Sequence, residues 1–388
     1  GTPVQTSPAS NPYSGFGENF QYVQYEHNPA TQTSDPNLAC QNDEPGELCT
    51  CTHGGYPTCP PYNGQYSLSN TIANYLGLNT ELTKAIAISH DIGHSPFGHK
   101  GEKVLNEISL RDIGQSFWHE KNGVHFVDDI ELLEDAHGDL KNLDLTYAVR
   151  DGIISHCGEI DENSLKPRSQ AIDLKDYTKP NEYSPYTWEA CVVKISDKIS
   201  YIGRDIEDAF HLNLLNNEKL EELKNILGIQ NKEALNNPNI INELIIDICN
   251  NSTIEKGICF STEKLNLINK IKEFNYNNIY SHPRLDASNE YFKIIINRIY
   301  NTLKNAYDKE NTLSNLEELK KFYPQTIIRF KDWLHKYWNL TDRTNTNLKN
   351  KIIYDYTNPQ DYYKAIIDFI AGMTDNYAID MYNEIVSF

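Results

Sequence analysis

"SHDIGHSPFGHKGE", residues 89–102, places three histidines, two acidic residues and a Ser-Pro step within fourteen residues. Gly93 is a typical residue for the end of a helix, and Pro96 suits the first turn of the next one. The stretch therefore predicts two helices joined by a tight turn, with His90 and Asp91 ending the first. His99 and Glu102 would share one face of the second helix, because they are three residues apart.

This turn concentrates groups that bind metals and transfer protons. Imidazole and carboxylate side chains are ligands for divalent transition metals and for Mg²⁺ or Mn²⁺, and a bound metal can generate a nucleophile from water at neutral pH. A single His-Asp pair is more often a surface or helix-capping pair. Three histidines and two acids around one turn favour a metal site over that simpler interpretation.

Helical periodicity runs through most of the chain after residue 66. In residues 67–93 the apolar side chains recur at helical spacing, beginning with Leu68 and Ile72. Similar patterns predict helices over further ranges: 99–109, 119–134, 145–156, 188–214, 238–250, 261–273, 287–306, 313–338 and 359–386. Strands are hard to find, so the sequence predicts an all-α fold.

The composition changes along the chain and suggests three regions. Residues 1–66 contain no Lys, Arg or Ile and are rich in proline, which predicts loops and turns. Residues 67–215 form the predicted helical core, and residues 216–388 a helical C-terminal region. The Asn- and Lys-rich stretch 215–237 is the candidate junction between them. Trp333 and Trp338 in the last region are expected to serve packing or subunit contact.

Bulk properties narrow the class of protein. With 388 residues, 39% of them hydrophobic, the chain can bury a large core. A net charge of −19 repels phosphates, so nucleic acid is not expected as a substrate, and a small anionic substrate would need a metal or a few placed cations. The apolar runs are short of a membrane span and no secretory signal is visible, so we expect a cytoplasmic protein without a membrane segment.

The cysteines fall into two groups. Four lie near His53 in the N-terminal region, and their spacing matches no strong zinc template: Cys40, Cys49, Cys51 and Cys59. The other four are scattered through helical sequence, where we expect small buried apolar groups: Cys157, Cys191, Cys249 and Cys259.

A second stretch, "VVKISDKISYIGRDIEDAFHL" at 192–212, predicts an amphipathic helix. Its apolar stripe comprises Ile195, Ile199, Ile202, Ile206 and Phe210. The opposite stripe is polar and comprises Asp197, Tyr201, Arg204, Asp205 and Asp208. This polar stripe is either a solvated surface or a functional face, in which Asp197 supplies a distant carboxylate to the metal and the following turns contact substrate.

A third stretch, "SFWHEKNGVHFVDDIELLE" at 116–134, places His119 after two aromatic residues and before an amphipathic pattern. His119 could be a helix-start residue packed on Trp118. It could equally be a general acid or an anion-binding group.

Together the three stretches resemble the HD-domain superfamily and, within it, the deoxynucleoside triphosphate triphosphohydrolases, or dGTPase-like proteins. "HDIGHSPFGHKGE" resembles the signature of that family, which is more specific than His-Asp alone. "WHE", "YAVRDGIISH" (147–156) and "DKISYIGRDIEDA" (197–209) follow in the order of the family, and the last also resembles the SAM-and-HD-domain triphosphohydrolases. The resemblance covers roughly residues 67–215, with a weaker match in "NYNNIYSHPRL" (275–285), and implies an HD-domain helical core with a helical C-terminal extension.

The resemblance also implies a metal site. His90, Asp91 and Asp197 match the metal ligands of the family, and His53 is the nearest candidate for the first histidine ligand. The implied cofactor is a divalent metal, Mn²⁺ or Mg²⁺, with Fe, Ni or Zn as further candidates.

Catalytic and substrate-binding roles are carried over in the same way. His99 and Glu102 match the pair assigned to catalysis, and His119 matches a histidine that approaches the triphosphate. Three residues would bind phosphate, the sugar face near C2′ and the 3′-hydroxyl, respectively: Lys198, Tyr201 and Asp205.

The N-terminal region departs from the family pattern. Counting back from "LGLN" (76–79) without a gap, the position of the first metal histidine falls on Pro61, whereas His53 lies eight residues earlier. His53 could be a displaced ligand, the Cys and His cluster could bind structural zinc, or the segment could be foreign to the fold. The family's Arg-rich sequence before this helix is also missing, which would weaken triphosphate binding.

Three hypotheses follow from these residues and from the resemblance. The first is metal-dependent hydrolysis of deoxynucleoside triphosphates, with dGTP the expected substrate, to deoxynucleoside and inorganic triphosphate. The second is an HD phosphohydrolase acting on a nucleoside monophosphate or another phosphoester. The third is a catalytically decayed nucleotide-binding relative. The family also implies a homo-oligomer and a regulatory nucleotide as a further partner.

Overall fold

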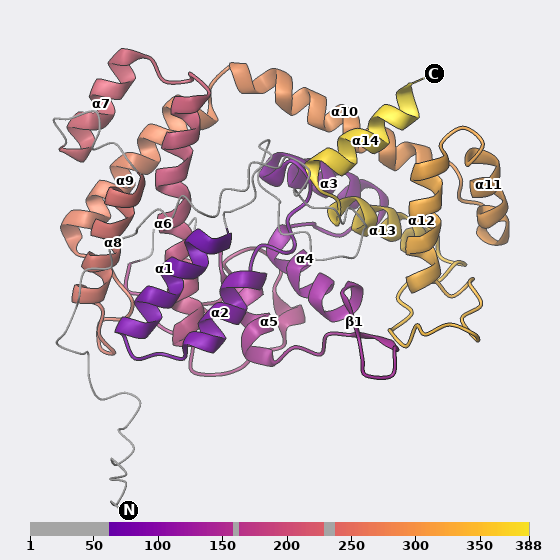
Figure 1. The fold of residues 1–388 in the computed structure, drawn as a ribbon, viewed down its shortest axis with the longest axis horizontal. Coiled ribbons are helices and arrows are strands. Elements are labelled where there is room, and N and C mark those ends of the chain that lie inside the picture. Colours follow the sequence, from indigo (N-terminus) through magenta and orange to yellow (C-terminus); the bar gives the residue numbers. More distant parts are fainter. Residues whose placement is uncertain (1–61, 158–162, 229–236, 388) are drawn as a thin grey trace, which may run out of the picture.

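The computed structural model describes residues 62–157, 163–228 and 237–387. Over these residues the chain forms fourteen α-helices and one two-stranded antiparallel hairpin (Figure 1). The prediction of an all-α fold is confirmed. His53 and the N-terminal cysteine cluster lie outside the described residues.

The first part of the chain forms helices that pack around a long central helix, α6 (Trp188–His211). The helices of this part are α1 (Tyr62–Tyr75), α2 (Thr80–Ser89), α3 (Gly98–Asp112), α4 (His119–His125) and α5 (Tyr147–Ser155). Of these, α3 packs instead on the C-terminal helices α10 (Arg284–Lys304) and α13 (Pro359–Ala371). Helices α1, α2 and α5 contact α6 directly, and α4 packs on α5. In α6 the apolar stripe predicted from Ile195 to Ile206 is buried, whereas Phe210 is 46% exposed. On the opposite, polar stripe Asp208 is exposed, and the other members are partly buried: Asp197, Tyr201, Arg204 and Asp205.

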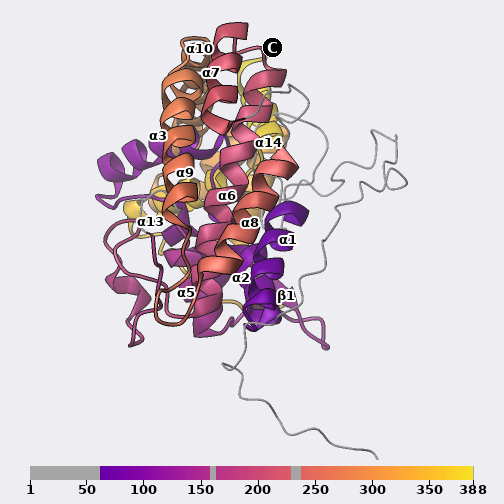
Figure 2. The ribbon, with the colours of Figure 1, turned by 90° about the vertical axis from the view of Figure 1, so that its left-hand side faces the viewer.

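Helices α8 and α9 pack on α6, with α8 also contacting α1, and α7 packs on α9 (Figure 2). Their bounds are α7 (Asn217–Leu227), α8 (Asn237–Asn251) and α9 (Thr262–Asn275). One hydrophobic cluster joins Leu68 of α1 and Ile199 of α6 to Leu223 of α7 and Ile271 of α9. Packing thus crosses residue 215 without a break, and the predicted domain boundary there stays a prediction.

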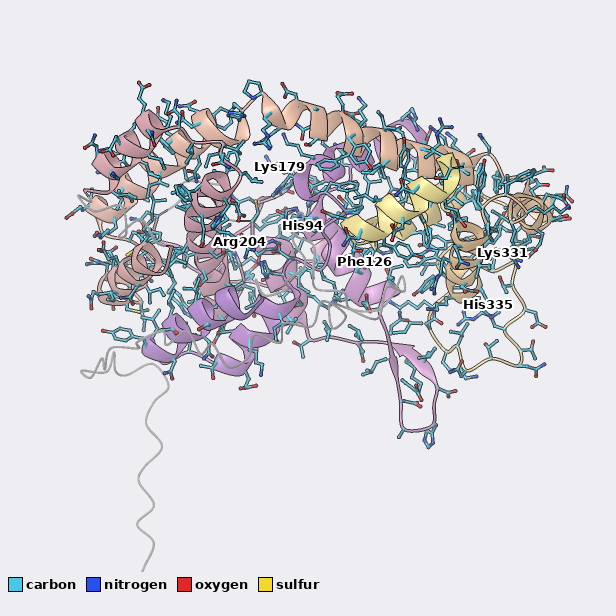
Figure 3. All side chains as sticks on the ribbon, turned by 45° about the horizontal axis from the view of Figure 1, so that its top comes forward. His94, Phe126, Lys179, Arg204, Lys331 and His335 are labelled. Atoms are coloured by element: carbon cyan, nitrogen blue, oxygen red, sulfur yellow. The ribbon has the colours of Figure 1, made fainter. Side chains whose placement is uncertain are left out.

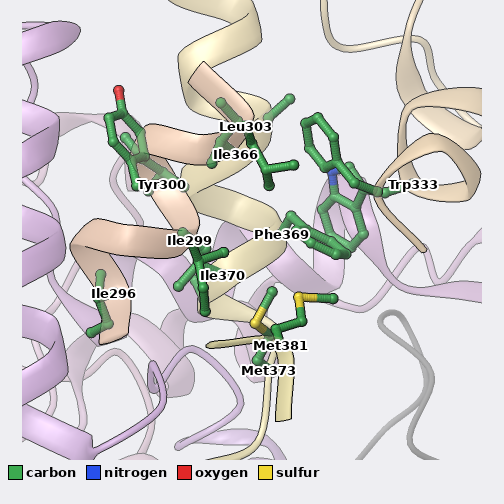
Figure 4. Packing of buried hydrophobic residues seen from close by; sticks show 14 of the residues in the cluster. Ile296, Ile299, Tyr300, Leu303, Trp333, Ile366, Phe369, Ile370, Met373 and Met381 are labelled. Carbon is green, nitrogen blue, oxygen red and sulfur yellow. The ribbon is translucent and has the colours of Figure 1, made fainter. Parts of the chain in front are cut away.

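The C-terminal helices form a second hydrophobic cluster at the opposite end of the molecule (Figure 1). They are α10 (Arg284–Lys304), α11 (Thr312–Leu319), α12 (Pro324–Tyr337), α13 (Pro359–Ala371) and α14 (Asp375–Val386). Figure 4 shows Ile299 and Leu303 of α10 beside Ile366 and Phe369 of α13, with Trp333 of α12 next to them. Trp333 and Trp338 are both buried, which confirms their expected role in packing.

The turn after α2 differs from its predicted form. Helix α2 ends at Ser89 with His90 as its cap, and α3 begins only at Gly98, after Phe97 in the left-handed region at φ +66°. Gly93 is not a helix cap, so that prediction is wrong. A Cβ atom at Gly93 would lie 2.0 Å from the carbonyl oxygen of His119, so glycine is required there because α4 packs directly against the turn.

Several predicted element bounds are also corrected. Pro324 divides the range 313–338 into α11 and α12, because proline lacks the N–H and crowds the preceding turn. Gly372 separates α13 from α14 within the range 359–386. The pattern at 119–134 leaves helical geometry after a π-helical turn, η3 (Phe126–Ile130), and enters the hairpin of β1 (Leu132–Glu134) and β2 (Leu140–Asn142).

Two further expectations concern burial and apolar length. The four cysteines expected to be small buried groups are buried: Cys157, Cys191, Cys249 and Cys259. In the part of the chain that the structure describes, every helix is too short or too polar to span a lipid bilayer.

Candidate metal centre and proton-transfer site

The candidate site lies where the α2–α3 turn meets helices α4, α5 and α6. The turn carries His90, Asp91 and His94, the first residue of α4 is His119, and Asp197 lies on α6. Figure 3 shows His94 in the interior of the view, between Arg204 of α6 and Phe126. The turn is fixed from two sides, because Asn122 Nδ2 donates to the carbonyl oxygen of Gly93 (2.9 Å) and the N–H of Phe97 donates to Asp375 Oδ1 of α14 (2.7 Å).

Residues 90–91 and residue 197 converge in space. His90 Nε2 lies 2.9 Å from Asp91 Oδ2 and 3.8 Å from Asp197 Oδ1. His90 is buried, and the two carboxylates are only slightly exposed. The structure therefore brings together three of the four predicted metal ligands, and the fourth, His53, is not among the described residues.

The hydrogen bonding of His90 shows what this arrangement can hold. His90 Nδ1 lies 2.9 Å from the carbonyl oxygen of Ala87, which can only accept, so Nδ1 carries the proton. Nε2 then faces carboxylate oxygens, which can only accept, so either a proton on Nε2 or a cation between these atoms is needed. A cation between these atoms would satisfy all of them. Metal-bound histidines commonly donate their other N–H to a backbone carbonyl in this way, so the residues fit a divalent metal.

The pKa shifts of His90 and Asp91 also reflect the close contact between the imidazole and the two carboxylates. Burial alone would lower the pKa of His90, but the carboxylates of Asp91 and Asp197 raise it to about 10. Burial would raise the pKa of Asp91, but His90 and His94 hold it well below its usual range. Without a metal the site thus retains a proton on His90, and a bound cation would replace that proton.

Two further histidines belong to this cluster, and the sequence analysis assigned them no role. His94 Nε2 and His156 Nε2 each lie 3.4 Å from Asp91 Oδ1. Both are buried. His94 stands inside the opening stretch and His156 ends "YAVRDGIISH", so both positions were visible in the matched motifs, although their convergence on Asp91 was not.

The predicted catalytic residues form a second group beside the first. His119 Nδ1 lies 2.8 Å from Glu102 Oε2 and 3.4 Å from Oε2 of Glu120, which is 1% exposed. The ring of His119 stacks on that of His94 at 3.9 Å between centroids. The ring of the exposed His99 meets it edge-on at 5.4 Å. The structure thus directs the carboxylate of Glu102 to His119, a contact that spacing within one helix could not reveal, and Glu120 is a further acid at the site.

The protonation state of His119 follows from its surroundings. Burial, together with the neighbouring imidazoles of His94 and His156, holds the pKa of His119 well below its usual range. His119 is therefore neutral at neutral pH. With Nδ1–H donating to Glu102, its Nε2 lone pair can accept a proton, which is the arrangement of a general base oriented by a carboxylate.

The predicted substrate residues continue along one face of α6. Lys198, Tyr201 and Asp205 follow Asp197 at helical spacing. Lys198 is 3% exposed and Tyr201 is partly buried. The hydroxyl of Tyr280 donates to Asp205 Oδ2. Burial raises the pKa of Asp205 to about 6, with the contact to Tyr280 opposing the shift. Tyr280 lies in the 275–285 stretch, which had been only a weak match to the family.

Comparison with known proteins places this geometry in a class. The HD domain family matches residues 66–202, which contain the metal cluster around Asp91 and the His119–Glu102 pair. The phosphohydrolase-associated domain family matches residues 331–384, from α12 to α14. Two segments of the chain thus match known families, the first an HD domain and the second a phosphohydrolase-associated domain.

More particular similarities extend over most of the chain. A deoxyguanosinetriphosphate triphosphohydrolase-like protein of Rickettsia typhi is 28% identical over 334 residues, covering 82% of this chain and 79% of the relative. A protein of the same name from Caldanaerobacter subterraneus subsp. tengcongensis is 29% identical over 319 residues, covering 82% of this chain and 71% of the relative. The matched domains and these relatives support phosphohydrolase activity, and the His and Asp cluster could bind a metal.

Proposed function

We propose that the protein hydrolyses deoxynucleoside triphosphates, with dGTP the expected first substrate, to deoxynucleoside and inorganic triphosphate in a metal-dependent reaction. The observation that carries the proposal is the convergence of His90, Asp91 and Asp197, with the His119–Glu102 pair at its edge. A metal site next to an oriented, neutral histidine can activate water and accept its proton, and both effects assist hydrolysis of a phosphate ester.

The metal would be held by His90 Nε2 and by the carboxylates of Asp91 and Asp197. When bound, it supplies a Lewis acid that polarises a phosphoryl oxygen and lowers the pKa of water. The side chain of His90 is held in the required tautomer by the carbonyl oxygen of Ala87. The protein thus fixes the direction in which Nε2 points, and the metal would take the place of the proton on that atom.

His119 would move the proton in the reaction. Its Nε2 accepts the proton of the water that attacks the α-phosphorus, and Glu102 stabilises the imidazolium through Nδ1–H. The bond between the α-phosphorus and the 5′-oxygen breaks, and the same proton passes to the 5′-oxygen of the departing deoxynucleoside. The products are then the deoxynucleoside and inorganic triphosphate, with atoms and charge in balance.

The face of α6 would select the sugar. Lys198 contacts phosphate, and Tyr201 lies against C2′, where a 2′-hydroxyl would collide with its ring. Asp205 uses one oxygen for Tyr280, which leaves the other to accept a hydrogen bond from the 3′-hydroxyl. Assembly into a homo-oligomer and a regulatory nucleotide remain predictions beside this proposal.

The proposal is tested by the products. Purified full-length protein is incubated with each of the four dNTPs and Mn²⁺ or Mg²⁺, and phosphorus NMR distinguishes triphosphate, pyrophosphate and orthophosphate. We expect triphosphate as the only phosphorus product, and none with the matched variant Asp197→Asn. Orthophosphate from a nucleoside monophosphate would favour a different phosphohydrolase. Stabilisation by dNTPs without any product would indicate a decayed, nucleotide-binding site.

A further inference from the structure

The C-terminal helices contact the α2–α3 turn at Phe97, the residue that precedes α3. Phe97 has a left-handed backbone at φ +66°, which is uncommon for a residue with a large side chain. Gly98 follows it and is also left-handed, at φ +55°. A residue other than glycine keeps this conformation only where its surroundings hold it there. The contacts of Phe97 therefore determine how the chain enters α3.

Two contacts from the C-terminal helices hold Phe97. Its N–H donates to Asp375 Oδ1 at 2.7 Å, and Asp375 is the first residue of α14. Its ring stacks on the ring of Phe292 of α10, with 4.3 Å between the centroids and 5° between the planes. Phe97 is only 7% exposed. Loss of the Asp375 acceptor would therefore leave an N–H with little access to water, which is unfavourable.

Helix α3 carries the acid of the proposed proton-transfer pair close to this turn. Glu102 follows Phe97 by five residues, and its Oε2 lies 2.8 Å from Nδ1 of His119. Helix α3 packs on α10 and α13, whereas α4, which begins at His119, packs on α5. The Glu102–His119 contact thus joins two helices that are held by different parts of the molecule. A backbone change at Phe97 would turn α3 and separate the two side chains.

We infer that Asp375 is a positioning residue for proton transfer: by accepting the N–H of Phe97, it holds the left-handed turn that directs Glu102 toward His119. The inference deepens the proposed function, because it rests on the role assigned there to Glu102 and His119. Asp375 lies within the segment 331–384 that matches the phosphohydrolase-associated domain. This segment then contributes to the reaction without touching substrate or metal.

The test observes the Glu102–His119 contact directly and needs no substrate. In full-length protein with isotope-labelled histidine, NMR detects the Nδ1 proton of His119, which is assigned by its absence in His119→Ala. We expect this proton at low field in the wild type and in Asp375→Asn, because an amide oxygen can also accept the N–H of Phe97. Asp375→Ala has no acceptor and should lose the signal, as Glu102→Ala does. Asp380→Ala, on the exposed side of α14, should keep it.

Kinetics separates a positioning role from a purely structural one. Asp375→Ala should lower kcat for dNTP hydrolysis by about 10–100-fold, with KM and bound Mn²⁺ near the wild-type values. Asp375→Asn should restore most of kcat. In a Glu102→Ala background, Asp375→Ala should have little further effect on kcat, because both substitutions act through one contact.

The inference is overturned if Asp375→Ala keeps the low-field proton, if Asp375→Asn loses it, or if the kcat effects of Asp375→Ala and Glu102→Ala are independent. The wild type alone also overturns it if that proton is missing or if the N–H of Phe97 exchanges rapidly with water, so the test does not require Asp375→Ala to fold.

The spectra and the product assay can fail separately. A protein that shows the expected pattern of spectra but releases no triphosphate would reject the proposed function and keep the positioning of Glu102 by Asp375. Triphosphate release by a protein whose His119 proton is insensitive to Asp375→Ala would do the opposite.

Discussion

Two histidine centres in this molecule use the same kinds of side chain in opposite ways. In the first, His90 and His156 direct their Nδ1 atoms to carbonyl oxygens and their Nε2 atoms to Asp91. In the second, His125 at the end of α4 lies between two acids, with Nδ1 3.1 Å from Asp129 Oδ2 and Nε2 2.9 Å from Asp368 Oδ2.

In the second centre the hydrogen bonds and charges of the side chains are balanced within the protein. Both ring nitrogens of His125 face carboxylates, so the ring donates twice and carries a positive charge. Asp368 also accepts from the hydroxyl of Tyr354 (2.7 Å) and the ammonium of Lys364 (3.0 Å). Burial and Lys364 would lower the pKa of His125, but Asp368 and Asp129 raise it. This network joins the end of α4 to α13 and ties the HD domain to the C-terminal helices.

The two centres differ in whether their acidic side chains find all their hydrogen-bond donors within the protein. Asp368 is surrounded by donors and needs nothing from outside the chain. Asp91 and Asp197 meet the lone pair of His90, and the charge balance of that group is completed only by a proton or a metal. We therefore expect substitutions in the first centre to change metal binding. Substitutions in the second centre should change the free energy of unfolding.

The largest expected effect is loss of function at the first centre. Asp91→Asn should lower bound Mn²⁺ and reduce dNTP turnover to the background rate, because the variant removes the carboxylate charge between His90 and His156. Asp368→Asn should keep its Mn²⁺. Metal analysis and triphosphate release measured side by side check both, and equal metal loss in the two variants would erase the contrast between the centres.

Next in size is the proton-transfer step. His119→Ala should lower kcat by about 10²–10⁴-fold while leaving bound metal unchanged, since His119 is assigned to the proton and not to the metal. Glu102→Gln should lower kcat less, because the imidazole remains. His125→Asn serves as the matched control and should keep near wild-type kcat at a temperature where it is folded. A His119→Ala enzyme with normal kcat would remove the residue from the mechanism.

The second centre should dominate stability. Asp368→Ala leaves the charge of His125 and the hydroxyl of Tyr354 buried with one acceptor fewer, which should cost about 3–5 kcal/mol of unfolding free energy. Asp332→Ala on the exposed face of α12 should change it by less than about 0.5 kcal/mol. Urea denaturation of the two variants measures the difference. Similar values for both would show that the network around His125 contributes nothing.

A smaller effect is expected at Asp205. Its carboxylate accepts from Tyr280, so it is intermediate between Asp91, which faces histidines, and Asp368, which accepts from several donors. The pKa of Asp205 is raised to about 6 by burial, so below that pH the carboxyl is protonated and accepts less well from the 3′-hydroxyl. kcat/KM should then fall about tenfold per pH unit below pH 6 and level off above it. Asp205→Asn should lower kcat/KM and abolish this acid limb. An unchanged limb in the variant would assign the limb to another group.

Local patterns predicted much of this structure, and long-range contacts account for the rest. The stripe of Ile195 to Ile206 predicted α6 and its buried face, because helical periodicity is a property of a short window. Gly93 was assigned to a helix end, but its requirement comes from the backbone of α4, 26 residues later at His119. Pro324, by contrast, was visible, and its break in the helix could have been predicted.

The candidate site shows the same division. The polar stripe at 192–212 raised the possibility that Asp197 serves the same metal as His90, and the resemblance to a family strengthened it. The structure places His90 Nε2 3.8 Å from Asp197 Oδ1. Helical spacing grouped Glu102 with His99, whereas the carboxylate reaches His119 on the next helix. His156 could not be assigned because nothing local marks a histidine that meets an acid 65 residues earlier.

The most direct test of the account is anomalous diffraction from crystals of the full chain grown with Mn²⁺. The account predicts a peak at the manganese edge within about 2–2.3 Å of His90 Nε2, Asp91 and Asp197. Manganese bound elsewhere would contradict the account if His90, Asp91 and Asp197 are then far apart. It would also contradict the account if these side chains contact only donors of the protein.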